Sequence, residues 1–378
     1  MLGLVLSGGA ARGAYNAGVM RFLFTDLLDR LGPVVWPGVI SGTSVGSLNA
    51  VFAACQTRES VEQLSALWQN IEIDQVYTIR GGGLLRTFRG MLKAAKQAAL
   101  LDPSPLHALV VQQFPHARVR QAIDSGAVRA FIVSATQVES GYNTLFVDSR
   151  EQCLDVRTFG GTVTSPVKIR SKHLLASTAI PLLFPPVQIG GSYYVDGGLR
   201  LNTPLRPVLR AGADKVLVIG SHAEKSSEPL DVVPSAQPSV PQLIGKTLNA
   251  LMLDPVDRDL AHASRINQIV AWGVQEYGQE FATRLNRELE IREVETLFVR
   301  PQRDIGEFAM ECFRASPPKT TPQVSWLLSK VADQAKSRES DFLSYLYFDR
   351  EYTGVLEQMG FEEARDREED LANFILSK

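Results

Sequence analysis

The chain has 378 residues, of which 45% are hydrophobic, so it can bury the core of one large domain or of two smaller ones. The formal net charge is only −2, so no overall field favours nucleic acid or acidic substrates. No uncharged apolar run reaches the length of a membrane span, and no signal-peptide pattern opens the chain. The three cysteines (Cys55, Cys153 and Cys312) are odd in number and widely spaced, which argues against a zinc site or a disulfide framework. We therefore expect a soluble protein in a reducing, cytoplasmic compartment.

The chain opens with an apolar strand at residues 2–6, a glycine-rich turn and a helix. The turn reads SGGAARGAY over residues 7–15, and apolar residues then recur at helical spacing up to residue 28. Backbone N–H groups at such a junction form an anion site. The pyrophosphate of a dinucleotide would require glycine at the position of Ala10 and an acidic strand end about 20 residues later, and neither is present. We favour the other known occupant, the oxyanion of a tetrahedral intermediate.

A second strand is predicted at residues 34–41, and it leads directly into a serine turn. Residues 42–46 read GTSVG, the G-x-S-x-G pattern of a nucleophile elbow. At such a turn Ser44 stands in a strained conformation at a helix N-terminus, and side chains at Gly42 and Gly46 would collide with the turn. A parallel strand–helix–strand unit brings the glycine-rich turn and Ser44 to the same edge of the sheet. The motif alone does not exclude an ordinary turn.

A segment at residues 81–101 is amphipathic and basic. After three glycines, apolar residues recur at helical spacing, and no acidic residue lies between positions 74 and 102. Such a helix can lie on an anionic membrane surface through residues 84–96. The simpler interpretation, which we favour, is a surface helix with a solvated basic face. The cations of that face are Arg86, Arg89, Lys93 and Lys96.

The rest of the chain alternates between predicted strands and helices. A hairpin is expected at residues 130–138 and 144–147, a helix at 173–180, and further strands at 188–195, 215–219 and 295–299. A Ser/Pro-rich loop is expected at 226–241, covering helices at 243–253 and 260–272, and helix from 325 onward. The end of the chain is acidic, which is typical of a solvated tail or a cap.

A serine hydroxyl needs a base to take its proton. His222 follows a predicted strand and would complete the order serine, acid, histidine, but only 43 residues precede Ser44, too few for that fold. Asp196 is the stronger candidate, because it ends an alternating segment and is followed by Gly197 and Gly198. An ordinary Asp-Gly turn is the alternative. A carboxylate is normally a weaker base than imidazole, and burial beside the serine would raise its pKa.

Three of these segments resemble, in order, the signatures of the patatin-like phospholipase family. They are residues 7–15, GTSVG at 42–46 and DGG at 196–198, and the approach to the aspartate at 176–186 is also similar. One departure is Ala10, where the family usually has its third glycine. The similarity covers roughly residues 1–220, and residues 241–348 look like the extended bacterial members of the family.

The resemblance implies an α/β protein with a three-layer α/β/α fold, a mostly parallel central sheet and a C-terminal helical extension. We expect a catalytic core at 1–220, an extended part of the same domain at 221–324 and a helical, acidic extension at 325–378. Ser44 would attack the ester carbonyl and Asp196 would accept and return the proton, without histidine, metal or cofactor. The oxyanion hole would be formed by Gly8, Gly9, Ala10, Ala11, Arg12 and Gly13, and Arg12 could orient the loop or a phosphate. The elbow and dyad turns would depend on Gly42, Gly46, Gly197 and Gly198.

We therefore expect a serine acyl hydrolase that cleaves fatty-acyl esters of phospholipids or lysophospholipids through an acyl-enzyme. One alternative is a hydrolase of soluble esters or thioesters with the same mechanism. The other is a membrane-associated scaffold with a vestigial site. No nucleic-acid partner is expected, membrane contact would be peripheral, and the oligomeric state is left open.

Overall fold

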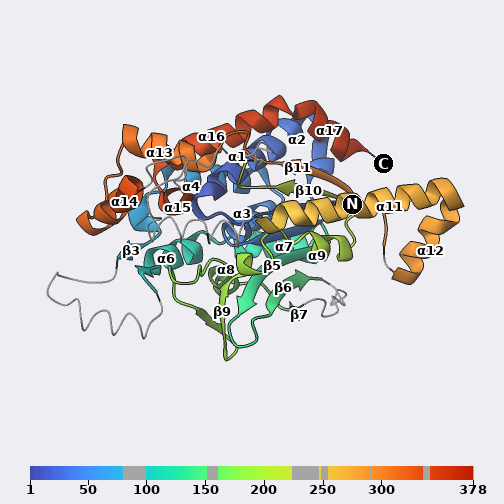
Figure 1. The fold of residues 1–378 in the computed structure, drawn as a ribbon, viewed down its shortest axis with the longest axis horizontal. Coiled ribbons are helices and arrows are strands. Elements are labelled where there is room, and N and C mark those ends of the chain that lie inside the picture. The colour runs from blue at the N-terminus through green and yellow to red at the C-terminus, as the bar shows by residue number, and fades with distance from the viewer. Residues whose placement is uncertain are drawn as a thin grey trace, which may run out of the picture.

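The computed structural model describes residues 1–79, 99–150, 161–223, 247, 254–289, 291–334 and 341–377. Within these residues a nine-stranded sheet runs through the middle of the molecule between layers of helices (Figure 1). In spatial order its main strands are β11 (Glu295–Val299), β10 (Lys215–Ile219), β1 (Leu2–Leu6), β2 (Val39–Thr43), β5 (Ala130–Gln137), β6 (Asn143–Ser149) and β7 (Thr162–Pro166).

Most neighbouring strands are parallel. The five strands from β11 to β5 run in one direction, β6 is antiparallel to β5, and β7 is parallel to β6. A hairpin of β8 (Val187–Ile189) and β9 (Ser192–Asp196) joins the sheet because β9 pairs antiparallel with β5. A small separate sheet pairs β3 (Thr78–Ile79) with β4 (Leu101–Asp102). The predicted α/β class with a mostly parallel sheet is confirmed.

Both faces of β1, β2, β5 and β10 are buried, which explains their largely apolar sequences. Successive residues point to opposite faces, so in β1 Leu4 and Leu6 belong to the larger hydrophobic core and Val5 belongs to a smaller one. The larger core lies under α1 (Gly13–Phe24), α3 (Val45–Ala54), α4 (Arg58–Asn70), α6 (Ser104–Gln113), α7 (His116–Ser125) and α8 (Ser171–Ser177).

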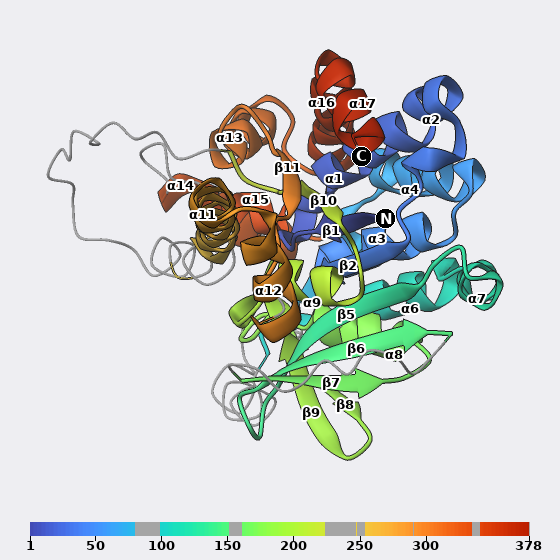
Figure 2. The same ribbon diagram turned by 90° about the vertical axis from the view of Figure 1, so that its right-hand side faces the viewer.

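The opposite face is covered by fewer helices. There α9 (Leu205–Arg210) packs on β1, β2 and β10, and α11 (Asp254–Tyr277) lies beside it with α12 (Gln279–Leu289) (Figure 2). Helix, sheet and helix therefore form the three layers that the sequence predicts. In the part of the chain that the structure describes, no helix is long and apolar enough to cross a membrane.

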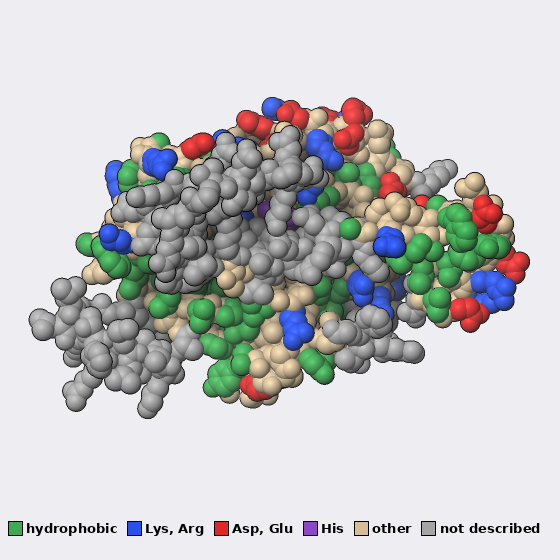
Figure 3. All heavy atoms as spheres, viewed as in Figure 1, with side chains coloured by type: hydrophobic (Ala, Val, Ile, Leu, Met, Phe, Trp, Pro, Cys, Tyr) green, Lys and Arg blue, Asp and Glu red, His purple; other side chains and the backbone are tan. Residues whose placement is uncertain are grey.

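The C-terminal region is a packed part of the larger core. It consists of α13 (Ile305–Ala315), α14 (Pro322–Gln334), α15 (Asp341–Leu346), α16 (Arg350–Asp366) and α17 (Glu368–Leu376). Helix α16 lies along α1, and α2 (Asp26–Leu31) touches α17 (Figure 1). Of the two predicted roles, a solvated tail is wrong and a packed cap fits, because the apolar sides of α16 and α17 are buried while acidic side chains line the outer edge (Figure 3).

Close backbone approach and a buried ion pair hold α16 against α1. A Cβ atom on Gly18 would overlap with the carbonyl oxygen of Glu357, so only glycine fits there. The fully buried Glu357 carboxylate accepts hydrogen bonds from Arg21 at 2.7 Å, from Ser65 at 2.8 Å and from Gln69 at 2.9 Å. The carboxylate is thus paired and solvated by protein groups, which a buried charge requires.

Several predicted boundaries need correction. The second strand begins at Val39 and not at residue 34, since residues 32–35 form a 3₁₀ turn and Pro37 has no N–H for the ladder. The helix predicted at 260–272 is the middle of the longer α11. At the end of the predicted basic helix, residues 101–102 are extended as β4, and residues 84–96 lie outside the described residues. Cys153, the loop at 226–241 and most of the helix at 243–253 also lie outside them.

Candidate active site

Ser44 stands between the end of β2 and the start of α3, as the sequence predicts. Its backbone angles are φ 53° and ψ −132°, a conformation that non-glycine residues rarely adopt. A Cβ atom on Gly42 would overlap with the carbonyl of Gly46, and one on Gly46 would overlap with the carbonyl of Leu6. Both glycines are therefore required by close backbone approach, which leaves the Ser44 side chain at the N-terminus of α3.

Two further serines hold Ser44 in this conformation. The Ser44 N–H donates to Ser177 Oγ at 2.9 Å, and the Ser177 hydroxyl donates to the Ser134 carbonyl at 2.6 Å. All three residues are buried. This chain of hydrogen bonds ties the strained turn to α8 and to β5, and strained conformations persist only where the surroundings fix them in this way.

Strand pairing brings Asp196 next to Ser44. On β5, Ser134 pairs with Thr43 of β2, and the next residue, Ala135, pairs with Asp196 of β9. Because β6 pairs along one edge of β5, both β2 and β9 pair with its other edge. The end of β2 and the end of β9 therefore meet on that edge. Gly197 makes this meeting possible, because a Cβ atom there would lie 2.5 Å from the carbonyl oxygen of Ser134.

The carboxyl group of Asp196 is fully buried. Its Oδ1 accepts the Gly198 N–H at 2.7 Å, while Oδ2 has no hydrogen-bond partner in the described chain. Burial raises the pKa of Asp196 to about 7, although the Ser44 hydroxyl and the Gly198 N–H both lower it by favouring the charged form. The Ser44 hydroxyl is thus near enough to affect the carboxyl, although no hydrogen bond joins the two groups.

The glycine-rich turn offers three backbone donors beside Ser44. The Gly8 N–H donates to Asn202 Oδ1 at 2.9 Å, and the N–H groups of Arg12 and Gly13 bond within the turn. Across the described residues, no acceptor is found for the N–H groups of residues 9–11. These three groups, and not all six of residues 8–13, are available to an anion.

Ala10 explains the usual preference for glycine at its position. Its φ is 50°, in the left-handed region where a Cβ atom costs roughly 1–2 kcal/mol. The methyl group is nevertheless accommodated, and Ala10 lines the same cavity as Ser44. The predicted departure from the family pattern therefore adds strain without closing the site.

Arg12 is directed away from this cavity. It is buried, its Nε donates to Ser344 Oγ at 2.8 Å, and its guanidinium lies 4.4 Å from the centre of the Tyr345 ring. Of the two roles that the sequence suggested, orienting the loop fits these contacts, because they tie the glycine-rich turn to α15.

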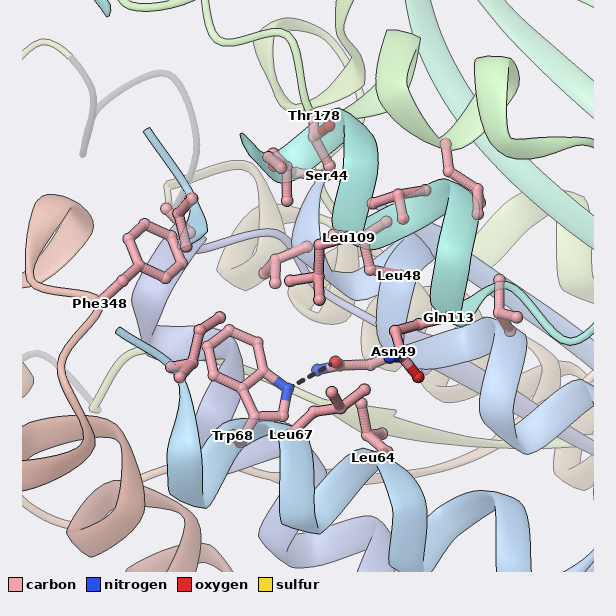
Figure 4. Close-up of a pocket in the computed structure, with 18 of the residues that line it drawn as sticks. Ser44, Leu48, Asn49, Leu64, Leu67, Trp68, Leu109, Gln113, Thr178 and Phe348 are labelled. Carbon is pink, nitrogen blue, oxygen red and sulfur yellow. Dashed lines mark hydrogen bonds between the residues drawn. The ribbon is translucent and has the colours of Figure 1, made fainter. Parts of the chain in front are cut away.

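An apolar cavity of about 100 Å³ leads from Ser44 into the protein between α3, α4 and α6. Ser44 and Thr178 lie at one end, and Leu64, Leu67 and Trp68 lie at the other (Figure 4). Away from Ser44, its polar side chains are already paired: Asn49 accepts the Trp68 indole N–H at 2.9 Å, the Gln113 side chain accepts a hydrogen bond from Gln63 at 2.8 Å, and the Thr178 hydroxyl donates to the Leu175 carbonyl at 3.2 Å. The cavity thus presents hydrocarbon to an occupant and suits an alkyl chain.

Neither a histidine nor a metal cluster completes this site in the described residues. No histidine donates to either oxygen of Asp196, and His222 lies 6.4 Å from Phe298, ring to ring. His173 accepts the Arg170 N–H on Nδ1, and burial lowers its pKa to about 4, so it serves the start of α8 as a neutral ring. No group of three metal-ligating side chains occurs in the ranges that the structure covers.

Sequence reasoning did not identify the side chains that position Ser44 and the loop. Ser177 accepts a hydrogen bond from Ser44, 133 positions earlier, and Asn202 accepts one from Gly8, 194 positions earlier. Ser134 acts through Ser177, because its carbonyl accepts the Ser177 hydroxyl. Only Ser177 lay in a segment that the resemblance includes. A lone asparagine or serine carries no periodic signal, so nothing in the sequence marked the others.

Comparisons with known proteins give a family match and similar solved structures. The model of the family "Patatin-like phospholipase" matches residues 4–209. The chain is similar to the crystal structure of VipD from Legionella pneumophila (13% identity, TM-score 0.36), covering 97% of this chain and 66% of that one. It is also similar to human GIVD cytosolic phospholipase A2 in complex with methyl gamma-linolenyl fluorophosphonate (12% identity, TM-score 0.44), covering 99% of this chain and 59% of that one. No curated protein matches in sequence. Because the family match spans more than half of its residues and includes both the glycine-rich turn and the serine turn, the chain belongs to the patatin-like phospholipase family.

Proposed function

We propose that this protein is a serine acyl hydrolase that cleaves fatty-acyl esters of phospholipids or lysophospholipids. The observation that carries the proposal is the position of Ser44, which opens into an apolar cavity and adjoins a buried carboxyl group. Membership of the family supports lipid ester substrates in general.

Ser44 is the proposed nucleophile and Asp196 the proposed base. Ser44 Oγ attacks the ester carbonyl carbon while its proton passes to Asp196, and the proton then goes to the leaving alcohol. Water then loses a proton to Asp196 as its oxygen attacks the acyl carbonyl carbon. The bond from that carbon to Ser44 Oγ breaks, Asp196 returns the proton to Ser44 Oγ, and the fatty acid leaves. A pKa of about 7 suits this role, because a general base works best when its pKa lies near the working pH.

The oxyanion would be stabilised by the free N–H groups of the glycine-rich turn. We assign this role to Gly9 and Ala10, with Ala11 next in the turn, and not to Gly8, whose N–H is occupied by Asn202. Losing one donor of such a site typically costs about 3–4 kcal/mol of transition-state stabilisation. The positive end of the α3 dipole adds to the stabilisation at Ser44.

The cavity lining favours a long acyl chain over a small polar ester. Each buried methylene group contributes about 0.8 kcal/mol, so an alkyl chain gains affinity along the whole path from Ser44 to Trp68. The alternative of a soluble-ester or thioester hydrolase retains the same mechanism and differs in the substrate that is cleaved. Peripheral membrane contact through residues 84–96 stays a prediction from the sequence.

Hydrolysis of p-nitrophenyl esters of increasing acyl length tests the proposal. Wild type should be active with chelator present and should prefer long chains, while Ser44→Ala and Asp196→Asn should lose activity with folding intact. Ser140→Ala removes an exposed hydroxyl from a distant loop and serves as the matched control. A preference for the shortest chains would favour the soluble-ester alternative, and a folded, inactive wild type would favour the scaffold.

A variant that fills the far end of the cavity tests the acyl site directly. Leu67→Trp should lower the ratio of long-chain to short-chain hydrolysis, because the indole would occupy the space of the chain terminus. Leu289→Trp places the same group at a position that is 62% exposed and should leave the ratio unchanged. An unchanged ratio in both variants would remove this cavity from the proposal.

A further inference from the structure

The side chain of Asn202 is a buried polar group near Ser44 whose Nδ2 the mechanism above does not use. It is fully buried, and its Oδ1 accepts the Gly8 N–H at 2.9 Å. That bond fixes the orientation of the carboxamide, because the reversed amide would point a donor at a donor. Nδ2 therefore carries two N–H bonds, and it has no acceptor among the described residues.

The side chains of Asn202 and Ser44 both lie next to Gly8 of the glycine-rich turn. A Cβ atom on Gly8 would lie 2.5 Å from Asn202 Oδ1 and 3.0 Å from Ser44 Cβ. The neighbouring backbone is also fixed to the serine turn, since the Thr43 hydroxyl donates to the Leu201 carbonyl at 2.9 Å. Asn202 is thus held against Gly8, on the side of the glycine-rich turn that faces Ser44.

A buried donor without an acceptor is unfavourable in the free protein, and such groups call for an explanation. A negatively charged oxygen that forms beside Ser44 during the reaction would supply the missing acceptor. Side-chain amides of asparagine serve as donors in oxyanion holes, and they act without the reorganisation that water would need. Because Asn202 Oδ1 accepts the Gly8 N–H, that N–H is not available to the oxyanion. The Nδ2 group of the same side chain would supply a donor in its place.

We propose that Asn202 is a side-chain donor of the oxyanion hole, acting together with the N–H groups of Gly9 and Ala10. This inference rests on the proposed function, because it requires an oxyanion at Ser44. It assigns two tasks to one carboxamide: Oδ1 holds the turn, and Nδ2 binds the developing charge.

Kinetics of Asn202→Ala with a p-nitrophenyl ester provide the first test. We expect kcat to fall by about 10²–10³-fold while KM changes less than about threefold, because the donor acts on the transition state. The inhibition constant of a trifluoromethyl ketone, which forms a tetrahedral adduct with the serine, should rise by the same factor. Asn70→Ala, at an exposed asparagine of α4, is the matched control and should change neither constant.

A purely structural role predicts different results. Asn202→Asp keeps an acceptor for the Gly8 N–H and loses the donor, so full recovery of kcat in this variant would overturn the proposal. A kcat for Asn202→Ala within threefold of wild type would also overturn it.

A measurement on the wild type covers the case in which the variants fail to fold. In ¹⁵N-labelled protein the Asn202 side-chain NH₂ signal should shift downfield when the trifluoromethyl ketone adduct forms. Adduct formation with an unmoved NH₂ signal would refute the role of Asn202 and leave the serine hydrolase intact. Wild type that neither cleaves esters nor forms the adduct would overturn both proposals together.

Discussion

The substitution Asp196→Asn is expected to stabilise this protein, increasingly so as the pH rises. The carboxyl is fully buried, and burial raises its pKa from 3.8 to about 7. The folded protein therefore binds this proton more tightly than the unfolded chain does. As a result, the free energy of unfolding falls as the pH rises from about 4 to about 7, and it stays low above that range.

The size of the effect follows from the two pKa values. Each pKa unit corresponds to about 1.4 kcal/mol, so the ionised Asp196 costs about 4 kcal/mol at pH 8. Asparagine keeps an acceptor for the Gly198 N–H and cannot ionise. The variant should be more stable than wild type at pH 8, and the difference should grow by roughly 2–3 kcal/mol between pH 5 and pH 8.

Urea denaturation followed by circular dichroism at pH 5, 6, 7 and 8 measures this difference. Asp214→Asn provides the contrast, because the N-terminal ammonium and Arg292 lower the pKa of Asp214, so its removal should destabilise the fold at neutral pH. A stability difference for Asp196→Asn that does not grow with pH, or a variant less stable than wild type at pH 8, would refute the argument from burial.

Three other predictions follow from the same structure. If Asp196 is the base, kcat/KM should rise with pH and reach half of its maximum near pH 7, and a flat profile from pH 5 to 9 would exclude it. Gly18→Ala should lower the free energy of unfolding by about 2–3 kcal/mol, because its methyl group overlaps with the backbone of α16. At Gly354 an added methyl group would make only ordinary van der Waals contacts, so Gly354→Ala should stabilise α16 by up to about 1 kcal/mol. Equal effects of Gly18→Ala and Gly354→Ala in urea titrations would contradict the packing argument. Ala10→Gly should raise the free energy of unfolding by up to about 1 kcal/mol, because glycine adopts the left-handed φ of this position without strain. Ala14→Gly in the interior of α1 should lower the free energy of unfolding by about the same amount or more. Thermal unfolding measures both variants, and the opposite order of stability would contradict the argument.

The sequence alone indicated the local framework of the candidate site. Apolar runs ending in Ser7-Gly8-Gly9 and in Gly42-Thr43-Ser44 predict two buried strands, each followed by a turn and a helix, and both arrangements are present. These features could be predicted because their causes are local. Glycine is required within two residues of Ser44 by the backbone itself, and the helix periodicity begins immediately afterwards.

Only the tertiary structure decided how distant segments meet. The register of β5 against β2 and β9 places Asp196 beside Ser44, 152 positions earlier, and no local pattern encodes that register. It also decided that Asn202 occupies the Gly8 N–H, so the donors of the turn are fewer than the glycine pattern suggests. The cavity arises where α3, α4 and α6 leave space between them, and the acidic C-terminal helices prove to be core elements. Hydrogen bonds and packing between residues far apart in the chain depend on three-dimensional register, which is why the sequence could suggest candidate catalytic residues but not their partners.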